Sequence, residues 1–235
     1  MKVAMIGAGG WGTAMMISLA ARHDDLFMYC RNPQTAQEIQ KSRENKNYLP
    51  GCRIPLHVKI TSSLETAVKG AGCVILCTPS HAVEAMAESL VPWLEKDTVV
   101  VCASKGLADH AGHRLSEVLK DKVKDITKKI VVLSGPNHAE EVGRGLPCAT
   151  VAASEVPEAV QVVQDLFMSP VFRVYRSDDI KGVEYGGALK NIMALACGVL
   201  DGIGLGDNSR SALMTRGLVE MTRFGVHFGA QMTTF

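Results

Sequence analysis

Three glycines near the start of the chain have the spacing of a diphosphate-binding turn. Gly7, Gly9 and Gly12 lie in the segment GAGGWG, between a short apolar run and a stretch of small residues. In such a strand–turn–helix the first glycine permits the tight turn, the second lets the backbone approach a pyrophosphate, and the third allows close helix packing. Free N–H groups at the helix start then face the phosphates. The pattern predicts a dinucleotide site, and the alternative is a glycine turn without a ligand.

An arginine follows the second apolar run, in the segment LFMYCRNP. NAD-specific proteins place an acidic residue here for the ribose hydroxyls, whereas a guanidinium binds a 2′-phosphate. Arg31 therefore predicts that NADP(H) is accepted, and the choice between NADP(H) and NAD(H) stays open. The alternative is an ordinary solvated arginine.

Two lysines stand where a cation could act on a substrate. Lys105 follows an apolar run in ASKG, at a strand end where open α/β sheets bind ligands. Lys190 lies in GGALKN, in a helical segment of small residues that can pack tightly. We expect Lys105 to meet a substrate phosphate or the cofactor. Desolvation in the helical segment would lower the pKa of Lys190, which could then exchange a proton with a carbonyl or alcohol. The alternatives are a surface lysine at 105 and a snorkelling lysine at 190.

The apolar run at residues 130–134 leads into the segment SGPNHAEE. Gly135-Pro136-Asn137 has turn chemistry, and we expect Asn137 to cap the helix that follows, with N–H groups facing the cleft. A plain structural turn is the alternative. His138 has no visible orienting partner, so we assign it no catalytic role.

The elements that carry these residues alternate between short apolar runs and longer amphipathic stretches. Strands buried on both faces are near-continuous apolar runs. We expect them at residues 2–7, 25–30, 57–61, 73–78, 98–103, 130–134, 149–153 and 171–175, with helices at 12–22, 33–44, 81–94, 113–122 and 157–168. This alternation predicts an α/β fold with a doubly wound, mostly parallel Rossmann-type sheet.

The pattern changes after residue 178, where strand candidates end. Segments 183–199 and 209–228 predict two long helices joined by the glycine-rich segment 201–207. We therefore expect a dinucleotide-binding domain over 1–178 and the beginning of an all-helical substrate and dimerisation domain over 179–235. Two such helices would expose large apolar faces, which favours a homodimer.

Composition excludes several classes of protein. The 235 residues carry a formal net charge of +1, which gives no electrostatic footprint for nucleic acid. No segment reaches the length of a membrane span, and the glycines after the first apolar run argue against a signal peptide. The seven cysteines are odd in number and form no CxxC pair, so we expect a reducing, cytoplasmic setting and no metal site.

Six motifs together resemble one family. GAGGWGTA, NYLPG followed by Ile54-Pro55, ASKGL, SGPNHAEEV, GALKN and DGIGLGDNSR are similar, in register along the whole chain, to NAD(P)-dependent glycerol-3-phosphate dehydrogenases of the bacterial soluble type. The resemblance implies that dihydroxyacetone phosphate and sn-glycerol 3-phosphate are interconverted by hydride transfer with NAD(P)H. It also implies a supply of glycerol phosphate for phospholipid synthesis.

The resemblance also implies roles for individual residues. Lys190 matches the family lysine that donates and accepts the proton at the C2 oxygen. Lys105 matches a family lysine that touches both cofactor and substrate. The substrate-binding positions are Gly135, Asn137 and Asn191 beside the two lysines, and the further cofactor contacts are Gly10, Trp11, Arg31, Ala139 and, on the adenosine side, Tyr48.

Two departures accompany the resemblance. His138 stands where many family members have Phe, at a variable position. Family members also continue for several helices, which carry an Asp and an Arg-Asn pair that grips the substrate phosphate. We therefore expect this chain to bind the cofactor without turning over substrate. The alternatives are a 6-phosphogluconate or 3-hydroxyacid type of Rossmann-plus-helical dehydrogenase, or a non-catalytic NADP(H)-binding module, against which Lys105 and Lys190 argue.

Overall fold

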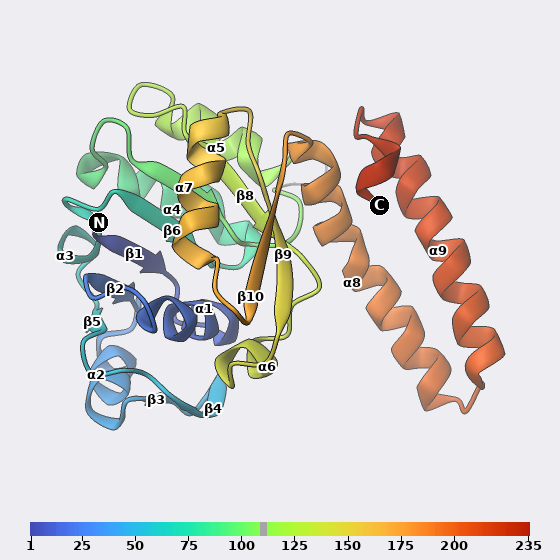
Figure 1. The fold of residues 1–235 in the computed structure, drawn as a ribbon, viewed down its shortest axis with the longest axis horizontal. Coiled ribbons are helices and arrows are strands. Elements are labelled where there is room, and N and C mark those ends of the chain that lie inside the picture. Colours follow the sequence, from blue (N-terminus) through green and yellow to red (C-terminus); the bar gives the residue numbers. More distant parts are fainter. Residues whose placement is uncertain (109–111) are drawn as a thin grey trace.

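An eight-stranded sheet forms the centre of the molecule in the computed structural model, which describes residues 1–108 and 112–235 (Figure 1). Its strands are β1 (Val3–Ile6), β2 (Leu26–Tyr29), β5 (Lys59–Thr61), β6 (Cys73–Leu76), β7 (Val99–Cys102), β8 (Ile130–Ser134), β9 (Cys148–Ala153) and β10 (Phe172–Ser177). They lie in the order β10-β9-β8-β7-β6-β1-β2-β5, and every neighbouring pair is parallel except β8 and β9. The expected mostly parallel, Rossmann-type sheet is confirmed.

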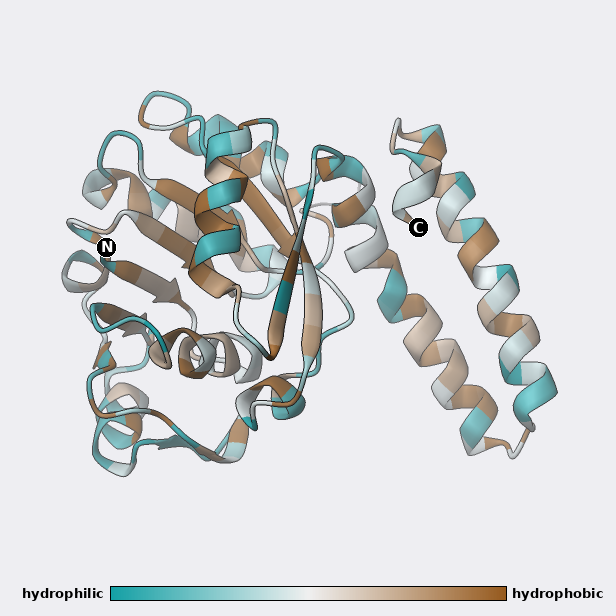
Figure 2. Cartoon of the chain, in the orientation of Figure 1, coloured by the Kyte–Doolittle hydropathy of each residue, from teal (hydrophilic) through white to brown (hydrophobic). Residues whose placement is uncertain are grey.

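The central strands are apolar because both of their faces are covered. All four residues of β1, β6 and β7 are buried, as strands with helices on both sides require. Along β1 the side chains alternate between two cores: Val3 and Met5 join one, and Ala4 and Ile6 the other. Figure 2 shows these strands in brown, the colour of hydrophobic residues.

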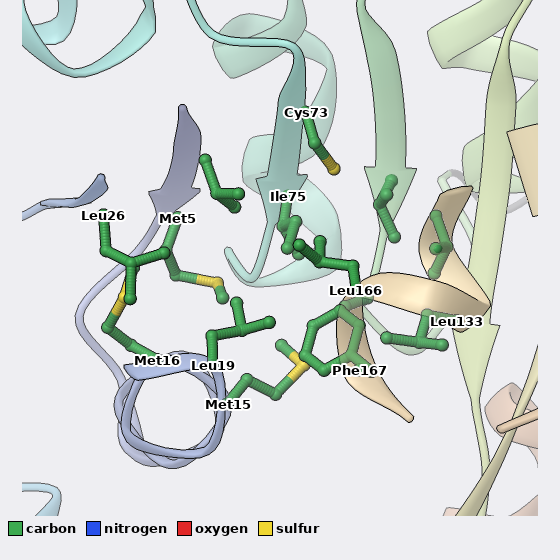
Figure 3. Close-up of a cluster of buried hydrophobic side chains, with 14 of the residues drawn as sticks. Met5, Met15, Met16, Leu19, Leu26, Cys73, Ile75, Leu133, Leu166 and Phe167 are labelled. Carbon is green, nitrogen blue, oxygen red and sulfur yellow. The ribbon is translucent and has the colours of Figure 1, made fainter. Parts of the chain in front are cut away.

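Helices from both sides complete the two cores. On one face, α1 (Gly10–Ala20) and α7 (Pro157–Phe167) pack on the sheet, and Figure 3 shows Met15 and Leu19 of α1 beside Phe167 of α7. The other face is covered by α3 (Leu64–Val68), α4 (Val83–Leu90) and α5 (Leu115–Val123). Short 3-10 turns flank α4 at Ser80–Ala82 and Val91–Trp93, so the expected single helix over 81–94 is shorter at both ends.

One pair of short strands was not expected from the sequence. The two-stranded antiparallel sheet β3 (Glu44–Asn45) and β4 (Leu49–Arg53) follows α2 (Pro33–Ser42), whereas α6 (Ala139–Gly143), before β9, is the helix expected after Asn137. The β4 sequence LPGCR contains proline and glycine, which weaken a strand signal. These elements surround the amino end of α1, where the glycine turn lies.

Two long helices follow the sheet, as expected. Helix α8 (Ile180–Gly202) begins against the sheet, and α9 (Asp207–His227) returns antiparallel to it, so that the pair projects from the sheet (Figure 1). Buried residues of α8 lie only in its first eight positions, the last being Gly187. Farther along, Ile192 and Leu195 are 64% and 72% exposed. A 3-10 turn at Met232–Thr234 returns to the start of α8, where Asp179 accepts hydrogen bonds from Gly182, Gln231 and Thr234.

No helix among the described residues has the length and hydropathy of a membrane span.

Candidate functional site

The candidate site is a cleft at the carboxyl ends of four parallel strands. The turns after β1, β6, β7 and β8 meet there because the carboxyl ends of neighbouring parallel strands lie at one edge of the sheet. The cleft has a volume of about 420 Å³ and is lined by Gly9, Gly10, Trp11, Gly12, Cys77, Thr78, Pro79, Ala103, Ser104, Lys105, Asn137, His138 and Ala139. The structure therefore brings together glycine-turn and lysine residues that lie almost a hundred positions apart.

The three glycines occupy positions with different steric demands. Gly7 has φ +119°, and a Cβ on it would lie 2.6 Å from the carbonyl oxygen of Cys77. A Cβ on Gly12 would lie 2.2 Å from the carbonyl oxygen of Gly7, so only glycine lets α1 pack on the turn. Around Gly9, in contrast, a Cβ would meet no atom within 4 Å. Gly9 is thus free of packing constraints and borders the open cleft.

Unpartnered polar atoms beside the glycine turn fit a dinucleotide. Trp11 Nε1 and Thr78 Oγ1 are buried without a hydrogen-bond partner, and both residues line the cleft. Buried polar groups are normally hydrogen-bonded, so an orphan donor at a cleft marks a place for a ligand acceptor. Sugar hydroxyls and phosphate oxygens supply such acceptors, and the residues present therefore fit NAD(P)H.

The hairpin β3–β4 is fastened to the glycine turn by a buried asparagine. Asn45 Nδ2 donates to the carbonyl oxygen of Ala8 at 2.9 Å and to Thr13 Oγ1 at 2.8 Å. This connection brings the backbone of Tyr48 beside Gly10, where a Cβ would lie 2.7 Å from the Tyr48 carbonyl oxygen and 3.6 Å from Ala139 Cβ. The Tyr48 side chain itself is 61% exposed. The role of Asn45 was not predicted, because an asparagine outside any motif gives no indication in the sequence of what it will contact.

Arg31 lies two residues beyond the carboxyl end of β2 and is exposed to solvent. It does not line the cleft. Its position at the strand next to β1 is where the Rossmann arrangement places the ribose of the adenosine half. The side chain is thus free to meet a ligand phosphate.

Lys105 connects two of the turns. Its Nζ donates to the carbonyl oxygen of Gly135 at 3.0 Å. Burial, together with the nearby cation of Lys190, lowers the pKa of Lys105 to about 8. The turn is held by Ser104 Oγ, which donates to the Thr78 carbonyl oxygen at 2.6 Å. Lys105 is therefore a fixed, partly desolvated cation at the junction of the β7 and β8 turns.

Lys190 approaches the same turn from α8. It lines a second hollow of about 380 Å³ with Ser134, Gly135 and Pro136. Close packing brings it there, because a Cβ on Gly187, one turn earlier, would lie 2.5 Å from Ser134 Oγ. Both lysines thus border Gly135, one in each hollow. Asn191 is exposed and lines neither hollow.

The expected capping role of Asn137 is wrong. Helix α6 begins at Ala139, and its N-cap residue is His138, which makes no side-chain capping bond. Asn137 Nδ2 instead donates to the carbonyl oxygen of Ala149 in β9 at 2.8 Å. The tight turn, closed by the Asn137 N–H to the Gly135 carbonyl oxygen, directs the amide toward β9. Asn137 Oδ1 remains buried without a partner at the cleft.

The cysteines offer no reactive thiol at the cleft. All seven are free, and burial raises the pKa of Cys77, the one that lines the cleft, well above its ordinary value. In the described part of the chain, no group of three or more His, Cys, Asp or Glu side chains could hold a metal ion.

Comparisons with known proteins agree on one family. The models for the N-terminus and the C-terminus of NAD-dependent glycerol-3-phosphate dehydrogenase match residues 2–160 and 179–235. The chain is 51% identical to glycerol-3-phosphate dehydrogenase [NAD(P)+] of Moorella thermoacetica, covering 100% of this chain and 69% of that protein. The corresponding protein of Pelotomaculum thermopropionicum is 45% identical, with 100% and 67% covered.

A solved structure extends this likeness to the fold. The chain superimposes on glycerol-3-phosphate dehydrogenase from Coxiella burnetii with a TM-score of 0.93 and 33% identity, covering 99% of this chain and 71% of that one. The structure of the Saccharomyces cerevisiae enzyme is similar at a TM-score of 0.85 and 26% identity, covering 100% of this chain and 73% of that one.

Proposed function

This chain belongs to the NAD-dependent glycerol-3-phosphate dehydrogenase family, an NAD(P)H-dependent family of enzymes, and from this premise we propose that its cleft and its two lysines serve the interconversion of dihydroxyacetone phosphate and sn-glycerol 3-phosphate. The observation that carries the proposal is the convergence of Lys105 and Lys190 on Gly135, at the mouth of the cleft that begins at the glycine turn. Residues 1–178 bind the dinucleotide, and residues 179–235 begin the helical part that receives the substrate.

Lys190 exchanges the proton at the substrate oxygen. When bound, the nicotinamide supplies the hydride to C2 in the reductive direction and accepts it in reverse. The C2 oxygen gains a proton as the C–H bond forms, and the Lys190 ammonium donates it, becoming a neutral amine. In the oxidative direction the same amine takes the proton back. The small residues before Lys190 allow α8 to lie close enough to the sheet for this contact.

Lys105 and the turn after β8 hold the substrate. The Lys105 cation faces the anionic substrate and the cofactor, and the bond from its Nζ to the Gly135 carbonyl oxygen fixes its direction. Gly135 and Asn137 contribute backbone groups and the unpartnered Asn137 Oδ1. Asn191, the next residue after Lys190, binds the substrate from the exposed side of α8.

The glycine turn would hold the dinucleotide. The first turn of α1 would receive the pyrophosphate at Gly9 and Gly10. The unpartnered atoms Trp11 Nε1 and Thr78 Oγ1 would supply hydrogen bonds to it. Ala139 and the Tyr48 backbone close the turn from the side of Gly10. Arg31 would pair with the 2′-phosphate of NADP(H), so NADP(H) is accepted.

Three wider aspects belong to the same proposal. The reductive direction supplies glycerol phosphate for phospholipid synthesis. The exposed apolar side chains of α8 and α9 favour a homodimer. The seven free cysteines, four of which are buried, favour a reducing, cytoplasmic compartment.

The test compares turnover with binding. The chain covers 69% of the Moorella relative, so NADPH-dependent reduction of dihydroxyacetone phosphate is measured with a fusion of this chain to the part of that relative outside the match. We expect turnover in the fusion, its loss on Lys190→Ala, and unchanged NADPH affinity in that variant. Turnover that survives Lys190→Ala would show that the proton comes from another group.

A further inference from the structure

A buried ion pair joins the start of α5 to α8. Arg114 Nη1 lies 2.9 Å from Glu184 Oε2, and the two side chains are only 10% and 5% exposed. The Ser116 N–H donates to Glu184 Oε1 at 2.9 Å, and the Ser116 hydroxyl donates to Oε2. One carboxylate on α8 therefore accepts three hydrogen bonds from the start of α5, which packs on the sheet.

The arginine of this pair belongs to the segment that carries Lys105. Leu107 and Arg114 form an isolated antiparallel bridge, and the Ala108 N–H donates to the His113 carbonyl oxygen at 2.9 Å. The two arms of the segment are thereby held together, and Lys105 lies two residues before the bridge. A displacement of Arg114 is consequently transmitted to Lys105 through the backbone.

The glutamate of the pair belongs to the helix that carries Lys190. Glu184, Gly187 and Lys190 follow one another at intervals of three residues, so they lie along one side of α8. Gly187 contacts Ser134 at the end of β8, and Glu184 is fixed one turn before it. The register of α8 on the sheet is thus set by a steric contact and by a directional, charged one.

We propose that Arg114, Ser116 and Glu184 form a brace that holds Lys105 and Lys190 at their working separation, which makes Glu184 and Arg114 positioning residues of the site. The inference rests on the proposed roles of the two lysines. An apolar pair would hold the helix at least as firmly, because burying two charges costs desolvation energy. What the charged pair adds is direction: three hydrogen bonds to one carboxylate fix the rotation and the height of α8 relative to the Lys105 segment.

The test uses the titration of Lys105 as a measure of this separation. Lysine acylation across a pH series from neutral to alkaline, quantified by peptide mass spectrometry, gives the pKa of Lys105, which burial and Lys190 hold at about 8. If the brace is loosened, the cations of Lys105 and Lys190 move apart, so Glu184→Gln raises the pKa of Lys105. If α8 stays in place, the loss of the negative charge of Glu184 by itself lowers the pKa of Lys105. A rise in this pKa therefore indicates displacement, and a fall indicates a purely electrostatic effect, which contradicts the brace. A rise of half a unit reduces labelling of Lys105 at neutral pH about threefold.

The matched control is Glu117→Gln. Glu117 also pairs with Arg114, at 2.6 Å, but lies on α5, and its hydrogen bonds to described residues all come from Arg114. We expect the pKa of Lys105 to stay at its wild-type value in this variant. If Glu184→Gln does not fold, Ser116→Ala replaces it, because it removes one hydrogen bond without changing a charge. A Lys105 pKa unchanged in folded Glu184→Gln or Ser116→Ala, or equally raised in Glu117→Gln, overturns the brace.

A separate variant distinguishes failure of the brace from failure of the proposed function. Lys190→Met removes the neighbouring cation and must raise the pKa of Lys105, whatever holds α8 in place. If this variant leaves the Lys105 titration unchanged, the lysines do not share a site, and the proposed function itself fails. If it raises the pKa while the Glu184 and Ser116 variants do not, the shared site stands and only the brace is wrong.

Discussion

Lys105 Nζ and the carbonyl oxygen of Gly135 lie 3.0 Å apart, which ties the turn after β7 to the turn after β8. This bond places a partly desolvated cation where the nucleotide cleft meets the hollow lined by Lys190. The arrangement has consequences for cofactor choice, for the glycine turn, for the pH dependence of stability and for the attachment of α8.

The proposed contact of Arg31 with the cofactor is tested by reversing the charge of this residue. We expect Arg31→Asp to weaken NADPH binding by about 1.5–3 kcal/mol, the value of a charge-assisted hydrogen bond, which is roughly ten- to more than hundredfold in Kd. NADH affinity should hold or improve, because the carboxylate can accept from the ribose hydroxyls. Calorimetric titration with each cofactor measures both. The control is Arg22→Asp, an exposed arginine just past the carboxyl end of α1. An equal loss of NADPH affinity in both variants would remove Arg31 from the site.

The glycines should separate folding from binding. Gly12→Ala places a Cβ 2.2 Å from the Gly7 carbonyl oxygen, so we expect a loss of about 1–3 kcal/mol in the free energy of unfolding, the usual cost of overpacking. Gly9→Ala meets no atom within 4 Å and should change stability by less than about 0.5 kcal/mol. Its methyl group should nevertheless weaken NADPH binding at least about tenfold, because it occupies the space for the pyrophosphate. Denaturant melts and titrations of both variants measure the two effects, and a Gly9→Ala protein with wild-type affinity would contradict the assignment.

Lys105 gives stability a specific pH dependence. Its folded pKa of about 8 lies below the ordinary value of 10.5, so between these two values the unfolded chain binds more protons than the folded chain. Linkage then requires this contribution to rise with pH. The cost of the buried cation is fully present below pH 8 and is relieved as pH rises toward 10.5. Lys105→Met does not bury a cation, so we expect its free energy of unfolding to exceed that of the wild type below pH 8. This difference should shrink as pH rises from 8 to 10.5. Melts at several pH values check it, and a difference that does not vary with pH would be the opposite outcome.

The Arg114–Glu184 pair should dominate the stability of the α8 attachment. Removing one partner of a buried pair leaves the other charge uncompensated, at a cost of about 3–5 kcal/mol. We expect Glu184→Gln to lie near the lower end, because Arg114 keeps Glu117. Glu117, whose side chain is 45% exposed, should contribute no more than about 1 kcal/mol. Urea unfolding of the two single variants measures the difference, and similar losses would show that the buried contact carries no special weight.

The central strands β6 and β7 were predictable because one physical cause dominates their composition. Runs such as VVVC and CVIL are apolar on both faces, and only a strand covered by two layers of helices needs such a run. The glycine turn was predictable for a similar reason. Gly7 has a positive φ, and a Cβ on Gly12 would collide with the carbonyl oxygen of Gly7, so constraints within the motif exclude other residue types at both positions.

Features set by tertiary contacts escaped prediction. Asn137 carries a good capping residue type, but the antiparallel strand β9 offers its amide a partner, and that contact outweighs the local preference. Glu184 stands in a helix of small residues with nothing in the sequence to mark Arg114, seventy positions earlier, as its partner. Asn45 likewise finds Ala8 and Thr13 only after the hairpin β3–β4 has folded against α1.

The most direct test of the cofactor cleft uses the two tryptophans of the chain. Trp11 lies in the glycine turn, whereas Trp93 lies in the 3-10 turn beyond α4, away from the cleft. Bound NADPH accepts excitation energy from a nearby indole, so we expect titration to quench the fluorescence of Trp93→Phe, which retains Trp11, far more than that of Trp11→Phe. Equal quenching in the two variants, or no binding of NADPH to the wild-type chain, would contradict the account.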